Sequence, residues 1–528
     1  MPITQITLEN FKGVADAVTV PLRPITLLFG ANSAGKSTLL QALLYLRELL
    51  ERLNADADLL PASGASINLG GFRQFVHGHD LSRTVRIGVT VTVDDDGLPV
   101  YPVLGTEETA ASTEYQLPLD ALSGVKTAGI QVDIAWHGDT GKPWVVRYSV
   151  EINGCPVGHI EAPPTVLPKL MVNDEARIFD QISPFMDEDG QVSPPSNPDG
   201  SAIIGNLGHW MTPTFRVGGR VIPKFGAPLP TLEATDPEDS LYLTDAQARH
   251  IFSHVFVGAG DLVLRELQRI RYIGPIREVP SRSFAAQRTP AESRWADGSA
   301  AWDWLHLKPE FLTESTAKEI RSLGLGYRIE PHRTFGVPAD SRLGMLIERA
   351  RLGDAEAFED LASLPPGEVM QIEEHSRVRI VAEETGVEVA PCDIGVGVAQ
   401  VLPVVIGSMA PGYSVLAVEQ PELHVHPAVQ TRLADVLARQ VVGTQDRLLL
   451  LETHSEHLML RLLRRIREQQ EGEIEPGAPT VKPEDLSVLY LSNEGGAMQI
   501  TELPVTPDGD FSRQWPKGFF EERSAELF

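Results

Sequence analysis

Residues 25–38 join a short apolar run to a glycine-bounded loop whose side chains suit the binding of a phosphate group. The segment reads Ile-Thr-Leu-Leu-Phe-Gly-Ala-Asn-Ser-Ala-Gly-Lys-Ser-Thr. Gly30 and Gly35 would let the backbone wrap closely enough for successive N–H groups to point at a β-phosphate. Lys36 would place its ammonium on the β- and γ-phosphates, and Ser37 would offer a hydroxyl to Mg²⁺. The pattern predicts a phosphate-binding loop.

The segments on either side of the loop are those that this chemistry requires. Residues 25–29 are apolar and uncharged, as expected of a strand in the core of a sheet. Leucines recur at helical spacing from Leu39 to Leu53, which predicts a helix from Lys36 to about Leu53 with one buried face. Its positive end would point at the same phosphates. The expected nucleotide contacts are Gly30, Asn32, Ser33, Ala34, Gly35, Lys36, Ser37 and Thr38.

Two more apolar segments end in polar residues that phosphoryl transfer could use. One reads Val-Leu-Ala-Val and ends at Glu419, followed by Gln420, a proline and Glu422; the other reads Leu-Leu-Leu-Leu and continues with Glu-Thr-His-Ser, which includes His454. In an open α/β sheet the carboxyl ends of the strands form the ligand crevice, so three such ends can converge on one nucleotide. Glu419 could hold the hydration shell of Mg²⁺ while a neighbouring group orients the attacking water.

The composition indicates a globular protein of the reducing cytosol with more than one domain. The chain has 528 residues and a net charge of -27, which argues against broad attraction to nucleic acid or to an anionic membrane. Its two cysteines lack metal or redox spacing, and the N-terminus lacks a signal sequence. Residues 394–418 are uncharged, but glycines and prolines interrupt them, so we expect a loop, a short helix, a turn and a buried strand rather than a membrane span.

A local basic cluster stands out in this acidic chain between Arg265 and Arg282. Few acidic residues accompany it, so it is the best candidate for a contact with phosphate or nucleic acid. The alternative, which we favour, is that these arginines pair with the protein's own carboxylates. The candidate contact residues are Arg269, Arg271, Arg277 and Arg282.

Two histidine pairs resemble metal ligands at first sight. His77 and His79 lie in a glycine-broken loop without a third ligand nearby, so a structural loop is favoured over a metal site. His424 and His426 lie beside the acidic residues, where a loop that packs across a dimer is favoured over a metal pair.

The expected fold class is α/β: a nucleotide-binding head with a mixed or parallel sheet, an antiparallel β-lobe and a mainly helical insertion. Residues 3–14 alternate in polarity and suggest an edge strand, and residues 84–161 suggest the lobe. The expected domains are 1–161, the N-terminal half of the head; 162–365, an insertion that is irregular and then helical; 366–470, the C-terminal half of the head; and 481–528, a tail domain.

Several segments together resemble the ABC-type ATPases of the OLD-like group, which are relatives of the chromosome-maintenance and recombination ATPases. These segments are residues 30–38, 393–403, 418–427 and 452–455. Two others, Arg-Tyr-Ile-Gly-Pro-Ile-Arg at 271–277 and Trp-Pro-Lys-Gly-Phe-Phe at 515–520, resemble a bacterial subgroup with a C-terminal domain of unassigned function. Members of that subgroup often lie in phage-defence or mobile-element operons. The resemblance covers roughly residues 1–80 and 265–528.

The resemblance implies further site residues, ligands and partners. Gly395, Gly397 and Gln400 fall on the signature segment, which in such ATPases touches the γ-phosphate held by the partner subunit. Two chains would then enclose two molecules of ATP with Mg²⁺, giving a homodimer or a higher even oligomer. His454 falls on the switch histidine, and Gln74 lies in the loop that senses Mg²⁺ and water. An effector protein from the same operon, a nuclease or toxin, is the expected partner, with DNA as a further one.

One departure from the family pattern concerns the residue after Glu419. Most relatives have a glutamate there that activates water, whereas this chain has Gln420. A neutral amide can orient water but cannot take its proton, so turnover would fall by roughly 10²–10⁴ unless Glu422 substitutes as the base. The leading hypothesis is a slow ATPase that gates a DNA-related or defence activity. The alternatives are a non-hydrolysing scaffold held by ATP, and a repair ATPase that binds DNA through the arginine cluster.

Overall fold

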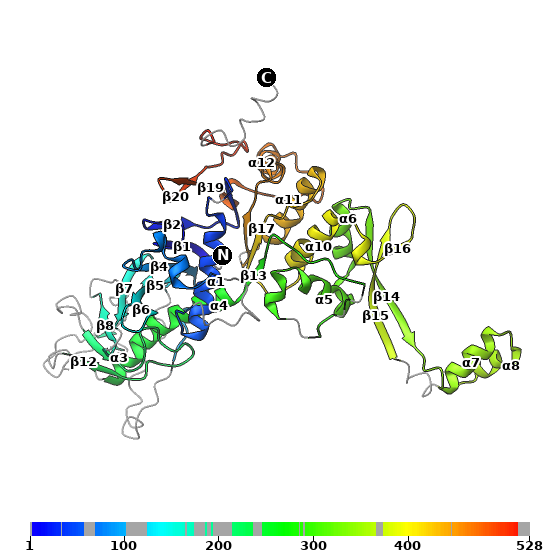
Figure 1. Ribbon diagram of the computed structural model, residues 1–528, viewed down its shortest axis with the longest axis horizontal. Helices are drawn as coiled ribbons and strands as arrows, with labels where there is room; N and C mark the ends of the chain where they lie inside the picture. The colour runs from blue at the N-terminus through cyan, green and yellow to red at the C-terminus, as the bar shows by residue number, and fades with distance from the viewer. Residues whose placement is uncertain are drawn as a thin grey trace. The chain divides into compact units, whose positions relative to one another are not determined.

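The structure is a computed structural model, in which the chain divides into two compact units. The first unit comprises Met1–Tyr272, Gly412–Gln420 and Leu437–Phe528, and the second comprises Ile273–Pro411 and Pro421–Val436. Figure 1 shows their elements. The residues that the structure describes are 3–32, 34–56, 69–101, 124–163, 166–173, 185–186, 192–193, 214–235, 245–282, 284, 286–288, 291–365, 373–444 and 446–515.

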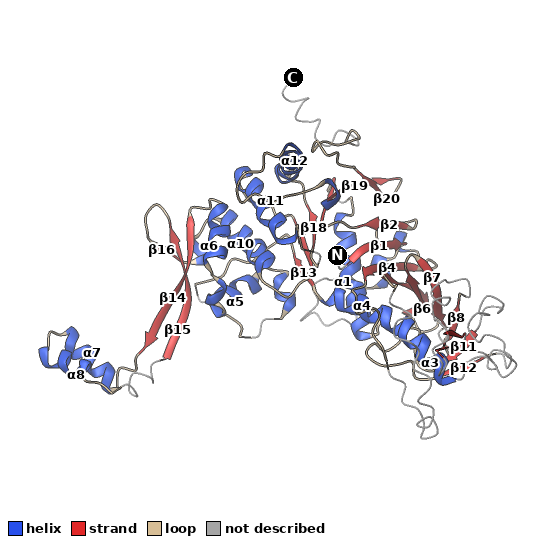
Figure 2. Cartoon of the chain, turned by 180° about the vertical axis from the view of Figure 1, so that it is seen from behind, coloured by secondary structure: helices blue, strands red, loops and turns tan. Residues whose placement is uncertain are grey.

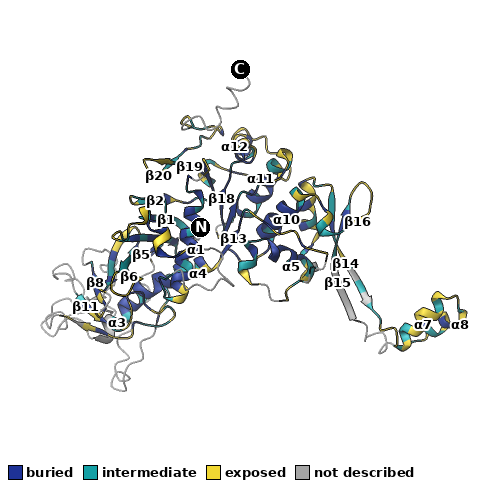
Figure 3. Cartoon of the chain, in the orientation of Figure 1, coloured by how far each residue is buried: buried dark blue, intermediate teal, exposed yellow. Residues whose placement is uncertain are grey.

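A six-stranded sheet forms the core on which the phosphate loop is built. Its order is β13-β17-β18-β3-β19-β20, and β17, β18, β3 and β19 are parallel to one another. The strands β3, β17 and β18 are buried throughout, as parallel strands covered on both faces should be (Figure 3). The bounds are β3 (Ile25–Gly30), β13 (Ile270–Ile273), β17 (Val415–Glu419), β18 (Leu448–Glu452), β19 (Leu486–Glu494) and β20 (Ala497–Glu502).

The helices that follow these strands confirm the expected strand–loop–helix order. Helix α1 (Lys36–Arg52) begins directly after Gly35 and buries its leucine face, which confirms the predicted helix to within a residue. Ser455 caps α12 (Glu456–Glu471), because its hydroxyl accepts a hydrogen bond from the N–H of Leu458. The uncharged stretch 394–418 forms α10 (Val396–Met409), a turn and β17, as predicted. Within the described residues, no helix combines the length and the apolar character needed to cross a membrane.

A second sheet of nine described strands forms the β-lobe of the first unit. Its order is β12-β11-β8-β7-β6-β5-β4-β1-β2, and the pairs are antiparallel. Helix α4 (Gly258–Gln268) packs on β4 and β5. The bounds are β1 (Ile3–Glu9), β2 (Val18–Pro21), β4 (Val85–Thr92), β5 (Thr127–His137), β6 (Lys142–Ile152), β7 (Cys155–Glu161), β8 (Lys169–Val172), β11 (Thr214–Val217) and β12 (Leu232–Ala234).

Two predictions about this region were wrong. The strand within residues 3–14 is not an edge strand, because β1 pairs with both β2 and β4. The lobe does not end at residue 161, because β8 pairs with β7 and the sheet continues to β12. The segment 481–528 contributes β19 to the core sheet, where it pairs with β3, and its assignment as a tail domain stays a prediction. Residues 194–200 of the expected irregular insertion, Ser33 and the tail at 516–520 lie outside the described residues.

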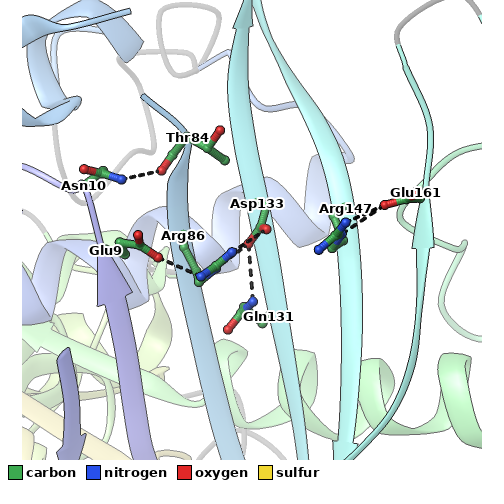
Figure 4. Close-up of polar contacts among 8 residues, drawn as sticks. All are labelled: Glu9, Asn10, Thr84, Arg86, Gln131, Asp133, Arg147 and Glu161. Carbon is green, nitrogen blue, oxygen red and sulfur yellow. Dashed lines mark hydrogen bonds and ion pairs between the residues drawn. The ribbon is translucent and has the colours of Figure 1, made fainter. Parts of the chain in front are cut away.

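A row of charged residues crosses the β-lobe at one register. Glu9 pairs across strands with Arg86, Arg86 with Asp133, and the row continues through the later strands to Glu233. Figure 4 shows Arg86 between Glu9 and Asp133, at 2.7 and 2.9 Å, and Arg147 against Glu161 at 2.7 Å. Since neighbouring side chains along a strand point to opposite faces, a slip of one residue would turn these charges toward the core. The members of the row are Glu9, Arg86, Asp133, Arg147, Glu161, Lys169, Arg216 and Glu233.

The second unit combines helices with a three-stranded antiparallel sheet, β14-β15-β16. Within the insertion expected at 162–365, β14 lies between helices, and it forms with β15 the long ribbon seen in Figures 1 and 2. The elements are α5 (Ser299–Leu307), α6 (Glu314–Ser322), β14 (Tyr327–Gly336), α7 (Arg342–Arg351), α8 (Ala355–Ala362), β15 (Glu373–Ala382), β16 (Glu388–Val389) and α10.

The remaining elements are short or lie between the two sheets in sequence. Helix α11 follows β17 and includes residues of both units, so the expected domain 366–470 is also divided between them. These elements are α2 (Phe72–Phe75), η2 (His77–His79), β9 (Phe185–Met186), β10 (Val192–Ser193), α3 (Asp245–Phe252), the π-helix η7 (Ser253–Val257), η8 (Glu292–Trp295), η9 (Pro309–Phe311), η10 (Pro391–Asp393), α11 (Pro427–Val441) and η11 (Pro483–Asp485).

Candidate nucleotide site

The ends of three parallel strands bring the candidate site together. In the register of the core sheet, Glu419 at the end of β17 lies beside Glu452 at the end of β18, and Glu452 lies beside Leu28 of β3. The phosphate loop leaves β3 directly after this point. The expectation that three strand ends converge is therefore confirmed for the strands themselves.

The two loop glycines occupy positions where a larger residue would not fit. Gly35 has a φ of 90°, which L-residues with side chains rarely adopt, and a Cβ there would lie 2.8 Å from the sulfur of Met498. A Cβ on Gly30 would overlap the carbonyl oxygen of Leu491. The loop is thus closely backed by the C-terminal segment, in addition to being flexible enough to approach a phosphate.

Lys36 points back into the loop that precedes it. Its Nζ donates hydrogen bonds to the carbonyl oxygens of Gly30 at 3.1 Å and Ala31 at 3.0 Å, and only 4% of the residue is exposed. The N–H of Thr38 bonds the carbonyl oxygen of Gly35 at 2.9 Å and so closes the turn into α1. These contacts hold the ammonium inside the curve of the loop, where the phosphates of a nucleotide would lie. Of the other predicted contacts, Ala34 is buried and Asn32 is exposed.

The hydroxyl of Ser37 lies between two buried carboxylates. It donates to Oε2 of Glu452 at 2.6 Å and lies 3.4 Å from Oε2 of Glu419. A hydroxyl and two carboxylates are hard oxygen donors of the kind that Mg²⁺ takes together with water and substrate phosphates. Both carboxylates are buried, at 7% and 6% exposed, so nearby positive charge stabilises their ionised form. The residues present therefore fit a magnesium ion.

Glu452 and Tyr272 were not among the residues predicted for the site. Both apolar strands end in glutamate after four apolar residues, and this shared ending was the signal that could have identified Glu452. The hydroxyl of Tyr272 donates to Oε1 of Glu419 at 2.8 Å, which orients that carboxylate. The sequence gives no comparable signal for Tyr272, because the contact joins residues far apart in the chain.

Lys12 adds a second cation near the site. Burial lowers the pKa of Lys12, and the nearby charge of Glu419 acts in the opposite direction. Its Nζ contacts the side-chain oxygen of Gln41 on α1. Lys12 lies in the turn after β1, where the sequence predicts a strand and a turn but no site residue.

His454 and Gln420 follow the two strands that carry the carboxylates. Burial, and then the positive charge of Lys36, lower the pKa of His454, so the imidazole is neutral at pH 7. Gln420 has a positive φ of 45°, and its N–H donates to the carbonyl oxygen of Glu452 at 2.7 Å. A non-glycine residue in this conformation is strained, which is common where a strand delivers a side chain to a site.

Gln74 and the first histidine pair lie on the loop around α2. Gln74 is exposed, and its predicted role toward Mg²⁺ and water stays a prediction. One ring nitrogen of each histidine lies against the backbone: Nδ1 of His77 is 2.9 Å from the Lys12 oxygen, and Nδ1 of His79 is 2.8 Å from the Arg73 oxygen. These contacts with backbone oxygens, one of them 65 positions away in sequence, agree with the structural loop that the sequence favours.

The signature residues and Glu422 belong to the second unit. Gly395 is the residue before α10, and a Cβ on Gly397 would lie 2.5 Å from the carbonyl oxygen of His424. The side-chain amide of Gln400 bonds the backbone of Arg277, accepting from its N–H at 3.3 Å and donating to its oxygen at 2.7 Å. Glu422 is half-buried. The roles of Gly395, Gly397, Gln400 and Glu422 toward a nucleotide stay predictions.

The candidate nucleic-acid residues do not form an exposed cluster. Arg271 and Arg277 are each only 2% exposed, and Arg271 lies over the ring of Tyr413, so neither presents its guanidinium to a large ligand. Arg269 is paired with Glu266 at 3.1 Å, and Arg282 with Asp393 at 2.7 Å. Arg271 and Arg277 are thus folded inward, whereas Arg269 and Arg282 pair with the protein's own carboxylates, which is the alternative that the sequence favours.

Comparisons with known proteins agree with part of this site. A family model described as an AAA ATPase domain matches residues 1–88, and one described as a protein of unknown function (DUF3696) matches residues 481–528. None of the curated proteins compared with the chain is similar enough to count as a match.

Solved structures with a loose likeness include three heads of SMC proteins. An SMC head bound to the C-winged helix domain of ScpA is 10% identical, with a TM-score of 0.38, over 96% of this chain and 98% of that one. The SMC head domain from Thermotoga maritima is 8% identical, with a TM-score of 0.36, over 96% and 100%. The Pyrococcus furiosus SMC head with an extended coiled coil, bound to the C-terminal domain of ScpA, is 11% identical, with a TM-score of 0.37, over 96% and 97%. The phosphate loop itself lies within residues 1–88, which are similar to an AAA ATPase domain.

Proposed function

We propose that this protein binds ATP with Mg²⁺ and hydrolyses it, as an ABC-type ATPase of the OLD-like group. The observation that carries the proposal is the position of Ser37, whose hydroxyl lies 2.6 Å from Glu452 and 3.4 Å from Glu419. A phosphate-loop hydroxyl beside two buried carboxylates is the donor set that a magnesium–triphosphate complex requires. The match of residues 1–88 to an AAA ATPase domain supports the same chemistry.

The contacts of each residue suggest its role. Lys36, held by two loop carbonyls, keeps its ammonium where it would neutralise the β- and γ-phosphates. Ser37, Glu419 and Glu452 would hold Mg²⁺ directly or through water, and the ion, when bound, would supply positive charge that neutralises the triphosphate. Tyr272 keeps the Glu419 carboxylate oriented for this task through its hydrogen bond.

The attacking water would be oriented rather than deprotonated by the residue after Glu419. Gln420 offers only a neutral amide, so the rate is expected to be low unless Glu422 removes the proton. A slow enzyme can still act as a switch, because ATP at about 1,000 times its dissociation constant shifts a binding equilibrium by about 4 kcal/mol. Under this proposal, the state of the protein depends mainly on whether ATP is bound, and less on how fast ATP is hydrolysed.

The switch would be a dimer that holds two nucleotides between its subunits. In this arrangement Gly395, Gly397 and Gln400 of one chain cover the γ-phosphate bound by the loop of the other. The dimer would gate a DNA-related or anti-phage activity through an effector, a nuclease or toxin encoded in the same operon. The support for this part is the resemblance of the signature segment, residues 393–403, and of the tail to that group of ATPases.

A steady-state ATPase assay tests the enzymatic part, with Lys36→Ala as the blank. We expect slow, Mg²⁺-dependent phosphate release by the wild type and none above background by the variant. Light scattering with and without ATP and Mg²⁺, alone and with the product of the adjacent gene, tests the dimer and the effector. A wild type that has no affinity for nucleoside triphosphates would overturn the proposal.

A second candidate function is a non-hydrolysing scaffold that uses ATP only to hold its assembly together. The observation that favours it is Gln420, which lacks the basic group of a catalytic glutamate. ATP-dependent dimer formation without phosphate release above the Lys36→Ala blank would select the scaffold over the ATPase.

A further inference from the structure

The C-terminal segment forms one side of the strand that leads into the phosphate loop. β19 pairs in parallel with β3 along the whole length of β3, from Leu486 beside Ile25 to Leu491 beside Gly30. The register therefore continues up to the first glycine of the loop. Residues 481–528 match a family of unknown function, so no role is attached to this segment by the comparison.

Both glycines of the loop lie against this segment. The carbonyl of Leu491 occupies the space where a Cβ of Gly30 would be, and the Met498 sulfur lies 2.8 Å from the Cβ position of Gly35. Met498 is itself fixed: it is 6% exposed, and its N–H donates to the carbonyl oxygen of Gly13 at 2.7 Å. The beginning and the end of the loop are thus backed by two points of one hairpin, β19–β20.

A third point of the segment lies against the last side chain before the loop. The ring of Trp515 packs edge-on against Phe29, with centroids 5.5 Å apart and planes at 84°. Phe511 and Tyr490 pack edge-on against the same indole, at 5.4 and 6.2 Å. Perpendicular contacts of this kind are the favoured geometry of aromatic pairs, so they hold the indole in one orientation.

We propose that residues 486–515 position the phosphate loop, with Met498 and Trp515 holding it in the shape that binds a triphosphate. A loop bounded by two glycines loses much conformational freedom when it closes on a ligand. Packing that orders the loop beforehand removes part of that loss and strengthens binding. The segment would thereby set the affinity for nucleotide, and this inference rests on the proposed function of the site.

The coupling must also act in the other direction. If the packing of Trp515 on Phe29 strengthens nucleotide binding, then by linkage bound nucleotide strengthens that packing to the same extent. Trp515 is partly exposed, so its fluorescence would respond to a change in its surroundings. Nucleotide occupancy would therefore be reported at the C-terminal segment.

Calorimetric titration of the full chain with ATP and Mg²⁺ tests the inference. We expect Met498→Ala and Trp515→Ala each to raise the dissociation constant about tenfold, whereas Met498→Leu and Trp515→Phe stay within about twofold of the wild type. Trp144→Ala is the matched control, because Trp144 is a 40% exposed tryptophan of the β-lobe. Wild-type affinity in both alanine variants would overturn the inference.

Two further readouts separate this inference from the proposed function and from misfolding. ATP should change the tryptophan emission of the wild type and of Trp144→Ala, but not that of Trp515→Phe. Hydrogen exchange of the nucleotide-free protein should be faster in Met498→Ala at the Thr38 amide, which closes the loop on Gly35. A wild type that does not bind ATP would contradict the proposed function. If ATP binds but exchange at the Thr38 amide is the same in Met498→Ala as in the wild type, the positioning role is wrong.

Discussion

The hydroxyl of Ser37 lies closer to Glu452 than to Glu419, at 2.6 Å against 3.4 Å. The carboxylate that the sequence pattern did not assign is thus the nearer of the two. Because the two strands are in register, the pair of glutamates forms one acidic position opposite the loop hydroxyl. A metal site of this kind depends on both acids.

Glu452→Gln is expected to weaken Mg²⁺-dependent activity as strongly as Glu419→Gln. Removing either charge leaves one carboxylate to face the ion, and changes in the immediate surroundings of a metal typically reduce affinity or activity by about 10–100-fold. The measurement is phosphate release as a function of Mg²⁺ concentration. Glu502→Gln is the control, because Glu502 is a partly exposed partner of Arg23. Normal Mg²⁺ dependence in Glu452→Gln would remove that residue from the site.

Gln420→Glu is expected to increase turnover by roughly 10²–10⁴, since it restores a group that can accept the proton of the attacking water. The N–H of Gln420 already bonds the Glu452 backbone, and this contact does not depend on the side chain. Single-turnover phosphate release at saturating ATP measures the change. Unchanged turnover in Gln420→Glu, together with complete loss in Glu422→Gln, would instead identify Glu422 as the base.

The sequence correctly predicted those parts of the fold that depend on residues close together in the chain. The phosphate loop and α1 follow from glycines, a lysine and leucine spacing within one short segment, and the structure places them as expected. The position of β19 beside β3 could not be predicted, because the residues of a parallel strand do not indicate which distant strand pairs with it. The same limit hid Tyr272, whose bond to Glu419 joins residues 147 positions apart.

The sequence pattern could not show that Arg271 and Arg277 are buried. Arg271 and Arg277 lie in a segment with many cations and few acids, which is the composition of an exposed nucleic-acid surface. In the fold they instead contact an aromatic ring and the backbone of a helix. Composition cannot distinguish these two environments, since both favour a guanidinium with several donors.

Arg277→Ala is expected to loosen α10, because the Arg277 guanidinium donates to the carbonyl oxygen of Gln400 at 3.3 Å. The bonded carbonyl lies in the turn before Pro403, where the helix already lacks the hydrogen bond that an N–H at position 403 would donate to the Ala399 carbonyl oxygen. Loss of a buried charged donor typically costs about 1.5–3 kcal/mol. Hydrogen exchange of the α10 amides measures the local opening free energy. Arg269→Ala, which removes an exposed arginine, should leave α10 unchanged; equal exchange in both variants would contradict the role of Arg277.

The pH dependence of turnover is expected to reflect a neutral His454. Burial and the charge of Lys36 lower the pKa of His454, so the imidazole gains its proton only below the ordinary value of 6.5. The acid limb of the turnover profile should therefore begin below pH 6.5, and His454→Ala should reduce turnover at every pH and remove that limb. The rate profile from pH 5 to pH 8 at saturating ATP provides the measurement. An acid limb centred at or above pH 6.5 would show that the assigned environment of His454 is wrong.

Two ion pairs in the charged row of the β-lobe, Arg86–Asp133 and Arg147–Glu161, are expected to contribute very differently to the free energy of unfolding. Arg86 pairs with Asp133, whose side chain is 6% exposed, whereas Arg147 and Glu161 are 42% and 36% exposed. Arg86→Ala leaves a buried carboxylate without its partner, which typically costs about 3–5 kcal/mol. Arg147→Ala removes a solvated pair worth about 0–1 kcal/mol.

Chemical unfolding of the full chain, followed by a probe in the β-lobe such as Trp136 fluorescence, distinguishes the two pairs. The double variant Arg86→Met with Asp133→Leu removes both charges and should recover most of the loss, because an apolar pair of similar volume needs no charge compensation. If Arg86→Ala and Arg147→Ala destabilise the lobe equally, the register of the sheet does not depend on the buried pair. A loss confined to Arg86→Ala, and reversed in the double variant, would show that desolvation of Asp133 is what makes the pair necessary.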